Sequence, residues 1–153
     1  MPKLHFDDCF TSAANVHKLE RVARLLPQTY LVMDGLAPWR NGKWPTRVRC
    51  MTKTKIIQGR SRGAGHGYTY VEGQHGGKEI WLNPYMTWEG YWIVLIHENM
   101  HHAFPDASED EINNALVPQV VEAVLRKSKS KEWYRKHGLG PPQPGIGDRG
   151  YVH

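Results

Sequence analysis

Residues 91–104 read YWIVLIHENMHHAF, in which six apolar residues lead into an HExxH motif at residues 97–101. On a helix, His97 and His101 lie one turn apart on one face, so both imidazoles can reach a single metal ion. Glu98 then lies beside that ion, where it can take a proton from a bound water molecule. Two histidines and a glutamate are costly to bury without a partner, so the apolar run favours a metal site over a surface helix that happens to carry histidines. The expected cofactor is one Zn2+ ion.

The composition indicates one globular domain, and the lack of a membrane span or signal peptide leads us to expect it in the cytoplasm. Of the 153 residues, 40% are hydrophobic and 23% are charged, which is ordinary for a soluble protein. No apolar run reaches the roughly 18 residues of a membrane span, and the first residues lack the apolar core of a signal peptide. In that compartment Cys9 and Cys50 are expected to be reduced thiols. We expect a monomer that makes no contact with a membrane.

Helical and alternating patterns precede the motif. Apolar residues at three- and four-residue spacing predict a helix over residues 12–26, which ends before Pro27. Strict alternation predicts a half-exposed strand over residues 46–57. After a glycine-rich stretch, further strands are expected near residues 68–72 and over residues 78–83.

Two helices are predicted from the motif onward. The first has Thr87 as its N-cap and ends near Phe104. The second begins at Ser108, which forms a capping box with Glu111. Pro118 lies inside the second helix and predicts a kink or a break into two pieces.

These elements predict an α+β fold with one domain. A small, twisted, mostly antiparallel sheet would be packed by an N-terminal helix, the HExxH helix and the following helix that carries glutamates. The domain is expected to span residues 1–127. Residues 128–153 read as a basic tail rich in glycine and proline.

The third zinc ligand must come from outside the motif, because zinc hydrolases usually take three ligands from the protein and leave one position for water. The longer pattern HExxHxxGxxH is absent, since Phe104 replaces its glycine and Ala107 its last histidine. Carboxylates at the start of the next helix are the remaining candidates. Glu109 is preferred, because it precedes Ile112 and Asn113 by three and four residues and so lies on the face that meets the core. The alternatives are Glu111, Asp110 and His137.

Three segments together resemble a known family: KEIWLNP (78–84), VLIHENMHHAFPD (94–106) and SEDEINNALV (108–117). A strand, an HExxH helix and a helix with glutamates, in this order, are similar to small zincin-superfamily metallopeptidases of the gluzincin type. The nearer comparison is with compact single-domain proteins of phages and bacteria, and the more distant one is with SprT-like proteins. The resemblance covers about residues 78–125, roughly a third of the chain, and implies a minimal zincin domain.

The resemblance also implies roles for single residues. His97 and His101 would be zinc ligands, and Glu98 would be the general base. Glu109 would be the third ligand, with Asn113 behind it to hold a ligating histidine by a hydrogen bond. The strand before the motif helix would be the sheet edge along which a peptide substrate pairs.

The expected function is that of a zinc-dependent metallopeptidase, a hydrolase (protease) of peptide bonds. Zinc lowers the pKa of its bound water to about 7, and Glu98 accepts the proton as the hydroxide attacks a carbonyl group polarised by the metal. The substrate class is left open among peptides, peptidoglycan and DNA-bound proteins. Candidates for the oxyanion donor are His66, Tyr68, His75, Tyr134 and His137.

Clustered positive charge raises a second interpretation. The net charge is +5, and no acidic residue lies between Asp34 and Glu72. A nucleic acid is a natural partner for such a surface. The basic face of the predicted strand, which would bind it weakly, consists of Arg47, Arg49, Lys53 and Lys55. The alternative function is therefore a catalytically inert, zincin-like zinc-binding module that contacts nucleic acid, and the simplest alternative is a solvated surface.

Overall fold

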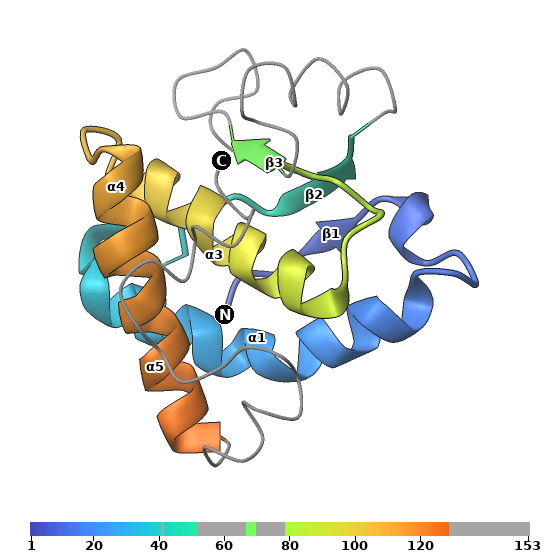
Figure 1. Cartoon of the computed structure of the whole chain (residues 1–153), viewed down its shortest axis with the longest axis horizontal. Helices are drawn as coiled ribbons and strands as arrows, with labels where there is room; N and C mark the ends of the chain where they lie inside the picture. Colours follow the sequence, from blue (N-terminus) through green and yellow to red (C-terminus); the bar gives the residue numbers. More distant parts are fainter. Residues whose placement is uncertain (41, 52–66, 70–78, 129–153) are drawn as a thin grey trace.

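The structure is a computed structural model that describes residues 1–40, 42–51, 67–69 and 79–128. Within these residues the chain forms a sheet, one helix that packs on it, and two outer helices (Figure 1). The fold is therefore mixed helix and strand, as the sequence predicts. Apart from Ser128, the predicted tail lies outside the described residues.

Helix α3 (Trp88–Ala103) carries the HExxH motif and lies in the middle of the fold. It packs against the sheet, while α1 (Val16–Leu36) and α5 (Val117–Ser128) pack against it and against each other (Figure 1). Of its 16 residues, all but two are buried. Its start is as predicted, because the Thr87 hydroxyl accepts a hydrogen bond from the backbone N–H of Gly90 at 3.2 Å.

The sheet is largely parallel, so the prediction of a mostly antiparallel sheet is wrong. Its strands lie in the order β1 (His5–Phe6), β2 (Arg47–Cys50), β4 (Glu79–Leu82) and β3 (Gly67–Thr69). β1 pairs with β2 and β2 pairs with β4 in parallel, and only β3 is antiparallel to its neighbour among these strands. Parallel neighbours need a long crossover connection, and α1 supplies it between β1 and β2. The parallel direction of β1 and β2 thus depends on where α1 packs, and local sequence patterns do not predict that.

β4 is an inner strand of the described sheet and is not its edge. It lies between β2 and β3, and all four of its residues are buried. The expectation that the strand before the motif helix forms the pairing edge is therefore wrong, and among the described strands β3 takes that position. The alternation predicted over residues 46–57 holds for Val48 in β2, which is buried. It fails at Met51, directly after β2, which is expected on the exposed face and is also buried.

Helix α1 continues through Pro27 and does not end before it, contrary to the prediction. Proline lacks the N–H that the preceding turn needs, at a cost of about 3 kcal/mol. The second half of the helix buries Tyr30 and Met33 in the core, and burial contributes roughly 1.5–3 kcal/mol for each side chain of this size. Packing therefore outweighs the break. None of the described helices is both long and apolar enough to cross a membrane.

The chain after α3 forms three helical pieces in succession: α4 (Glu109–Glu111), the π-helical turn η3 (Ile112–Leu116) and α5. The N-cap prediction is confirmed, because the Ser108 hydroxyl accepts a hydrogen bond from the Glu111 N–H at 3.1 Å. The predicted interruption near Pro118 is present as η3, which directly precedes α5. A π-turn inserts an extra residue and lets the helix continue where proline offers no donor.

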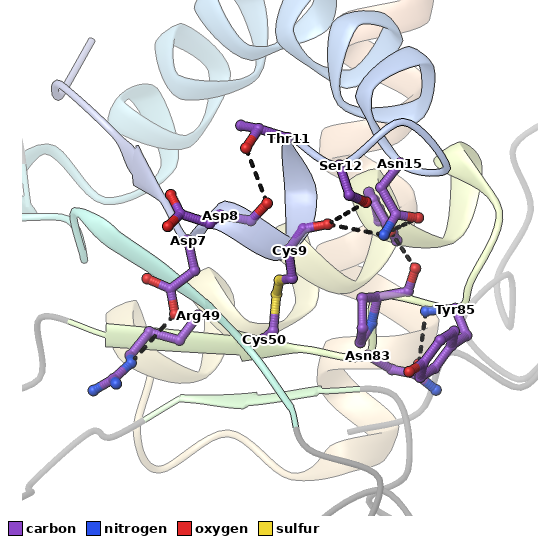
Figure 2. Close-up of a disulfide and its surroundings, with 12 residues drawn as sticks. Asp7, Asp8, Cys9, Thr11, Ser12, Asn15, Arg49, Cys50, Asn83 and Tyr85 are labelled. Atoms are coloured by element: carbon purple, nitrogen blue, oxygen red, sulfur yellow. Dashed lines mark hydrogen bonds and ion pairs between the residues drawn. A yellow bond between two sulfur atoms is a disulfide. The ribbon is translucent and has the colours of Figure 1, made fainter.

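Cys9 and Cys50 form a disulfide, so the expectation of reduced thiols is wrong (Figure 2). Cys9 lies in the short helix η1 (Asp8–Phe10), which follows β1 directly, and Cys50 is the last residue of β2. Because β1 and β2 run in parallel, their C-terminal ends meet, and the two Cα atoms are 6.5 Å apart, within the usual range for a disulfide. The bond ties the N-terminal segment to the sheet.

Candidate metal centre

The two motif histidines converge at the C-terminal end of α3. Their Nε2 atoms are 3.0 Å apart, as expected for side chains one helical turn apart on one face. His97 is fully buried, whereas the side chain of His101 is 20% exposed. The pair is therefore held by the core on one side and open to solvent on the other.

Glu109 completes this cluster from the next helix. Its carboxylate oxygens lie 2.7 Å from His101 Nε2 and 3.3 Å from His97 Nε2. The turn after α3 is tight, because the Ala107 N–H bonds to the Phe104 carbonyl at 3.0 Å before α4 begins. Glu109 is the first residue of α4 and so points back at the two histidines.

The pKa of Glu109 reports the same geometry. Burial alone would raise this pKa, but hydrogen bonds with His101 and His97, together with their charge, lower it well below the usual range. The carboxyl group is therefore ionised, which is the form that binds a cation.

Glu98 lies close to the cluster without entering it. Its Oε1 atom is 4.0 Å from His97 Nε2, and the side chain is only 2% exposed. Possible ligand atoms of His97, Glu98 and His101 all lie within 4.8 Å of one another. A carboxylate at this place can reach a small molecule bound between the histidines.

The donor set fits zinc. Two imidazole nitrogens and one carboxylate oxygen are a common catalytic set for this ion. Ligand atoms held at about 2.1 Å in a tetrahedron lie roughly 3.4 Å apart. The two Nε2 atoms here lie 3.0 Å apart, and each lies 2.7–3.3 Å from a different oxygen of the Glu109 carboxylate. A small opening of the cluster would accommodate the ion.

Buried polar contacts fix α3 behind the cluster. The Asn99 amide donates to the Leu95 carbonyl at 2.9 Å and to the Tyr30 hydroxyl of α1 at 3.4 Å. Trp92 Nε1 donates to the Thr29 hydroxyl at 3.0 Å, also on α1. Burial raises the pKa of Tyr30 far above its ordinary value, so its hydroxyl stays protonated. These bonds hold the helix in one rotational setting, with its histidines facing Glu109.

The other predicted ligands lie elsewhere or outside the described residues. Glu111 is exposed, and its backbone N–H donates to the capping Ser108 hydroxyl; Asp110 is also exposed. Asn113 is buried one turn after Glu109. The side chains outside the described residues are those of His66, Tyr68, His75, Tyr134 and His137.

Part of the basic strand face is neutralised by acids distant in sequence. Arg47 contacts Asp7 at 3.1 Å. Arg49 also contacts Asp7, at 3.5 Å (Figure 2). Arg49 also contacts Glu79 at 3.4 Å. Lys53 and Lys55 lie outside the described residues. Acidic residues from other parts of the sequence therefore lie beside this acid-free stretch in the folded chain.

Comparisons with protein-family models, curated proteins and solved structures find no match for the chain. Function is therefore inferred from the chemistry of the site itself.

Proposed function

We propose that the chain is a zinc-dependent metallopeptidase of the gluzincin type, with His97, His101 and Glu109 as its zinc ligands. The observation that carries this proposal is the convergence of two imidazoles and a carboxylate within 2.7–3.3 Å. Three protein ligands leave one coordination position for water, as in catalytic sites, whereas structural sites close all four.

Glu98 favours an enzyme over an inert metal site. When bound, zinc polarises the carbonyl group of the scissile bond and lowers the pKa of a coordinated water. Glu98 would accept a proton from the attacking water and deliver it to the leaving amine. The Glu98 side chain is only 2% exposed, and its Oε1 atom lies 4.0 Å from His97 Nε2, beside the two histidines, where a carboxylate can act as a base. A site that only stabilised the fold would not require it.

The peptide substrate is expected to pair with β3. Backbone groups of an edge strand are free to bond an extended peptide. Among the described strands, β3 lies at one edge of the sheet and packs against α3. This assignment replaces β4, which is flanked on both sides.

The metal assignment predicts different outcomes for two neighbouring glutamates. Glu109→Ala is expected to weaken zinc binding beyond the 10–100-fold that outer-shell changes typically cost, because it removes a direct ligand. Glu111→Ala is the matched control, since its side chain is exposed on the same helix. Zinc affinity measured by competition with a chromogenic chelator separates the two. Equal affinities for both variants would rule out Glu109 as a ligand.

The proposal is tested as a whole by metal analysis together with a peptide-library cleavage screen. We expect one zinc ion per chain and cleavage that stops on removal of the ion with a chelator and returns with added zinc. Absence of stoichiometric metal after purification without chelator would contradict the proposal. Stoichiometric zinc without cleavage of any peptide would favour the inert module.

The nucleic-acid alternative makes its own prediction. For the enzyme proposed here, we expect no binding of duplex DNA at roughly 50 mM salt. The inert module would instead bind with a steep salt dependence, and Lys53→Ser or Lys55→Ser would lower the slope of log affinity against log salt by about 0.9 for each phosphate contact removed. A fluorescence-anisotropy titration at several salt concentrations measures this slope.

A further inference from the structure

A short segment after α1 contacts the C-terminal end of the motif helix. It is the 3-10 helix η2 (Pro38–Arg40). Arg40 Nη2 donates a hydrogen bond to the His102 carbonyl at 2.9 Å, and Arg40 Nη1 lies 3.5 Å from His102 Nε2. The Trp39 ring packs edge-to-face on Phe104, with centroids 5.7 Å apart. Two consecutive residues of η2 therefore contact the last turn of α3.

Arginine is well suited to this place. The last four carbonyls of a helix have no partner within it, and this end carries partial negative charge. The Met100 carbonyl is satisfied by the Phe104 N–H at 2.8 Å, and the His102 carbonyl is satisfied by the Arg40 side chain. His101 lies between Met100 and His102. The two hydrogen bonds to their carbonyls therefore fix the conformation of the last helical turn, which carries His101.

The segment that carries Arg40 is itself held in place. The Arg40 N–H bonds to the Ala37 carbonyl at 2.8 Å, and Ala37 is bonded to Met33 of α1 at 2.9 Å. A few residues later, buried Trp44 donates from Nε1 to Asp34 of α1 at 2.6 Å. Arg40 therefore links the C-terminal end of α1 to the C-terminal end of α3.

The end of α3 in turn determines where Glu109 lies. From Phe104, which is the C-cap of α3, the chain makes one tight turn and begins α4 with Glu109. Metal ligands must be placed within about 0.2 Å of ideal distances. A change in the direction of the turn would move the Glu109 carboxylate relative to the two histidines.

We propose that Arg40 is a positioning residue of the metal centre: by capping α3 through the His102 carbonyl, it sets the turn that brings Glu109 to His97 and His101. This inference rests on the proposed zinc site. It differs from a general role in stability, because it predicts an effect on the metal that exceeds the effect of equal destabilisation elsewhere.

The test uses Co2+ as a spectroscopic probe of the site in the full chain. Arg40→Ala is expected to bind Co2+ roughly tenfold more weakly, the lower end of the loss found for outer-shell partners, and to change the intensity of its visible absorption. Arg40→Lys should restore much of the affinity, because an ammonium group can also donate to the His102 carbonyl. If Arg40→Ala does not fold, the Co2+ affinities of Arg40→Lys and Trp39→Ala are compared instead. Arg40→Lys should bind nearly as tightly as the wild type, and Trp39→Ala, which loses the contact with Phe104, more weakly.

Two controls separate positioning from stability. Arg126→Ala removes an exposed arginine paired with Glu122 on α5, remote in sequence from the end of α3. Val124→Ala lowers stability by opening the core. Both should bind Co2+ as the wild type does. Unchanged Co2+ affinity and spectrum in folded Arg40→Ala, or an equal loss in Val124→Ala at the same melting temperature, would overturn the inference. A wild type that binds no Co2+ would overturn the proposed function instead, and this inference with it.

Discussion

Glu98→Gln is expected to lower the rate of peptide hydrolysis by about 10²–10⁴-fold, the usual contribution of a positioned general base. Glutamine keeps the volume of this buried side chain but cannot accept the proton from water. Because Glu98 is not one of the three side chains that meet at the cluster, the zinc content and the melting temperature should stay close to those of the wild type. The measurement is kcat/KM on a cleaved peptide, with zinc determined on the same sample.

Glu89→Gln is the matched control for this prediction. Glu89 lies in the first turn of the same helix, more than two turns before the motif, and is one of the two residues of α3 that are not buried. Its replacement removes the same charge but should leave the rate unchanged. Full activity of Glu98→Gln would exclude the general-base role, whereas loss of zinc in that variant would place Glu98 among the ligands.

The geometry of the candidate site follows from local patterns in the sequence. The spacing of His97 and His101 fixes their common face on any helix. The start of each of the two helices is readable from Thr87 and Ser108, because an N-cap depends on neighbouring residues alone. Glu109 could be ranked first because a short turn and helical periodicity both place it towards the core. These are relations over fewer than about 15 residues, for which chain connectivity leaves little choice.

What the sequence could not reveal depends on contacts between distant segments. The directions of the strands depend on the crossover through α1, and α1 passes Pro27 only because core packing outweighs the lost bond. Arg40 gave no motif signal, since its partner is a backbone carbonyl 62 positions away. The acidic partners of the β2 arginines could not be found from the sequence for the same reason, because they include Asp7 on the N-terminal segment.

Removing the disulfide with Cys9→Ser and Cys50→Ser is expected to lower the free energy of unfolding by about 4 kcal/mol. The two cysteines are 41 positions apart, and closing a loop of this length removes conformational entropy from the unfolded chain by roughly that amount. For a folded part of this size, the melting temperature should fall by about 10–20 °C. Calorimetry or circular dichroism, with and without a phosphine reductant, measures the change.

The loss should begin in the N-terminal segment. β1 has only two residues and two paired positions with β2, and the disulfide is a covalent cross-link between the segment that follows it and β2. The same segment reaches α3, because the Asn15 amide donates to the Cys9 carbonyl at 2.9 Å (Figure 2). The Tyr91 hydroxyl of α3 lies 3.1 Å from Asn15 Oδ1. Hydrogen exchange should therefore rise first around η1 in the reduced protein.

Reduced wild type is the internal control for the double variant. Both should melt at the same temperature, and the double variant should not respond to the reductant at all. A wild type whose melting temperature is unchanged by the reductant would show that the thiols are not joined in solution. In that event packing alone would have to hold the N-terminal segment, through the buried Phe10. Its ring packs edge-to-face on Tyr91 with centroids 5.4 Å apart. Phe10→Ala should then lower the free energy of unfolding by about 3–5 kcal/mol.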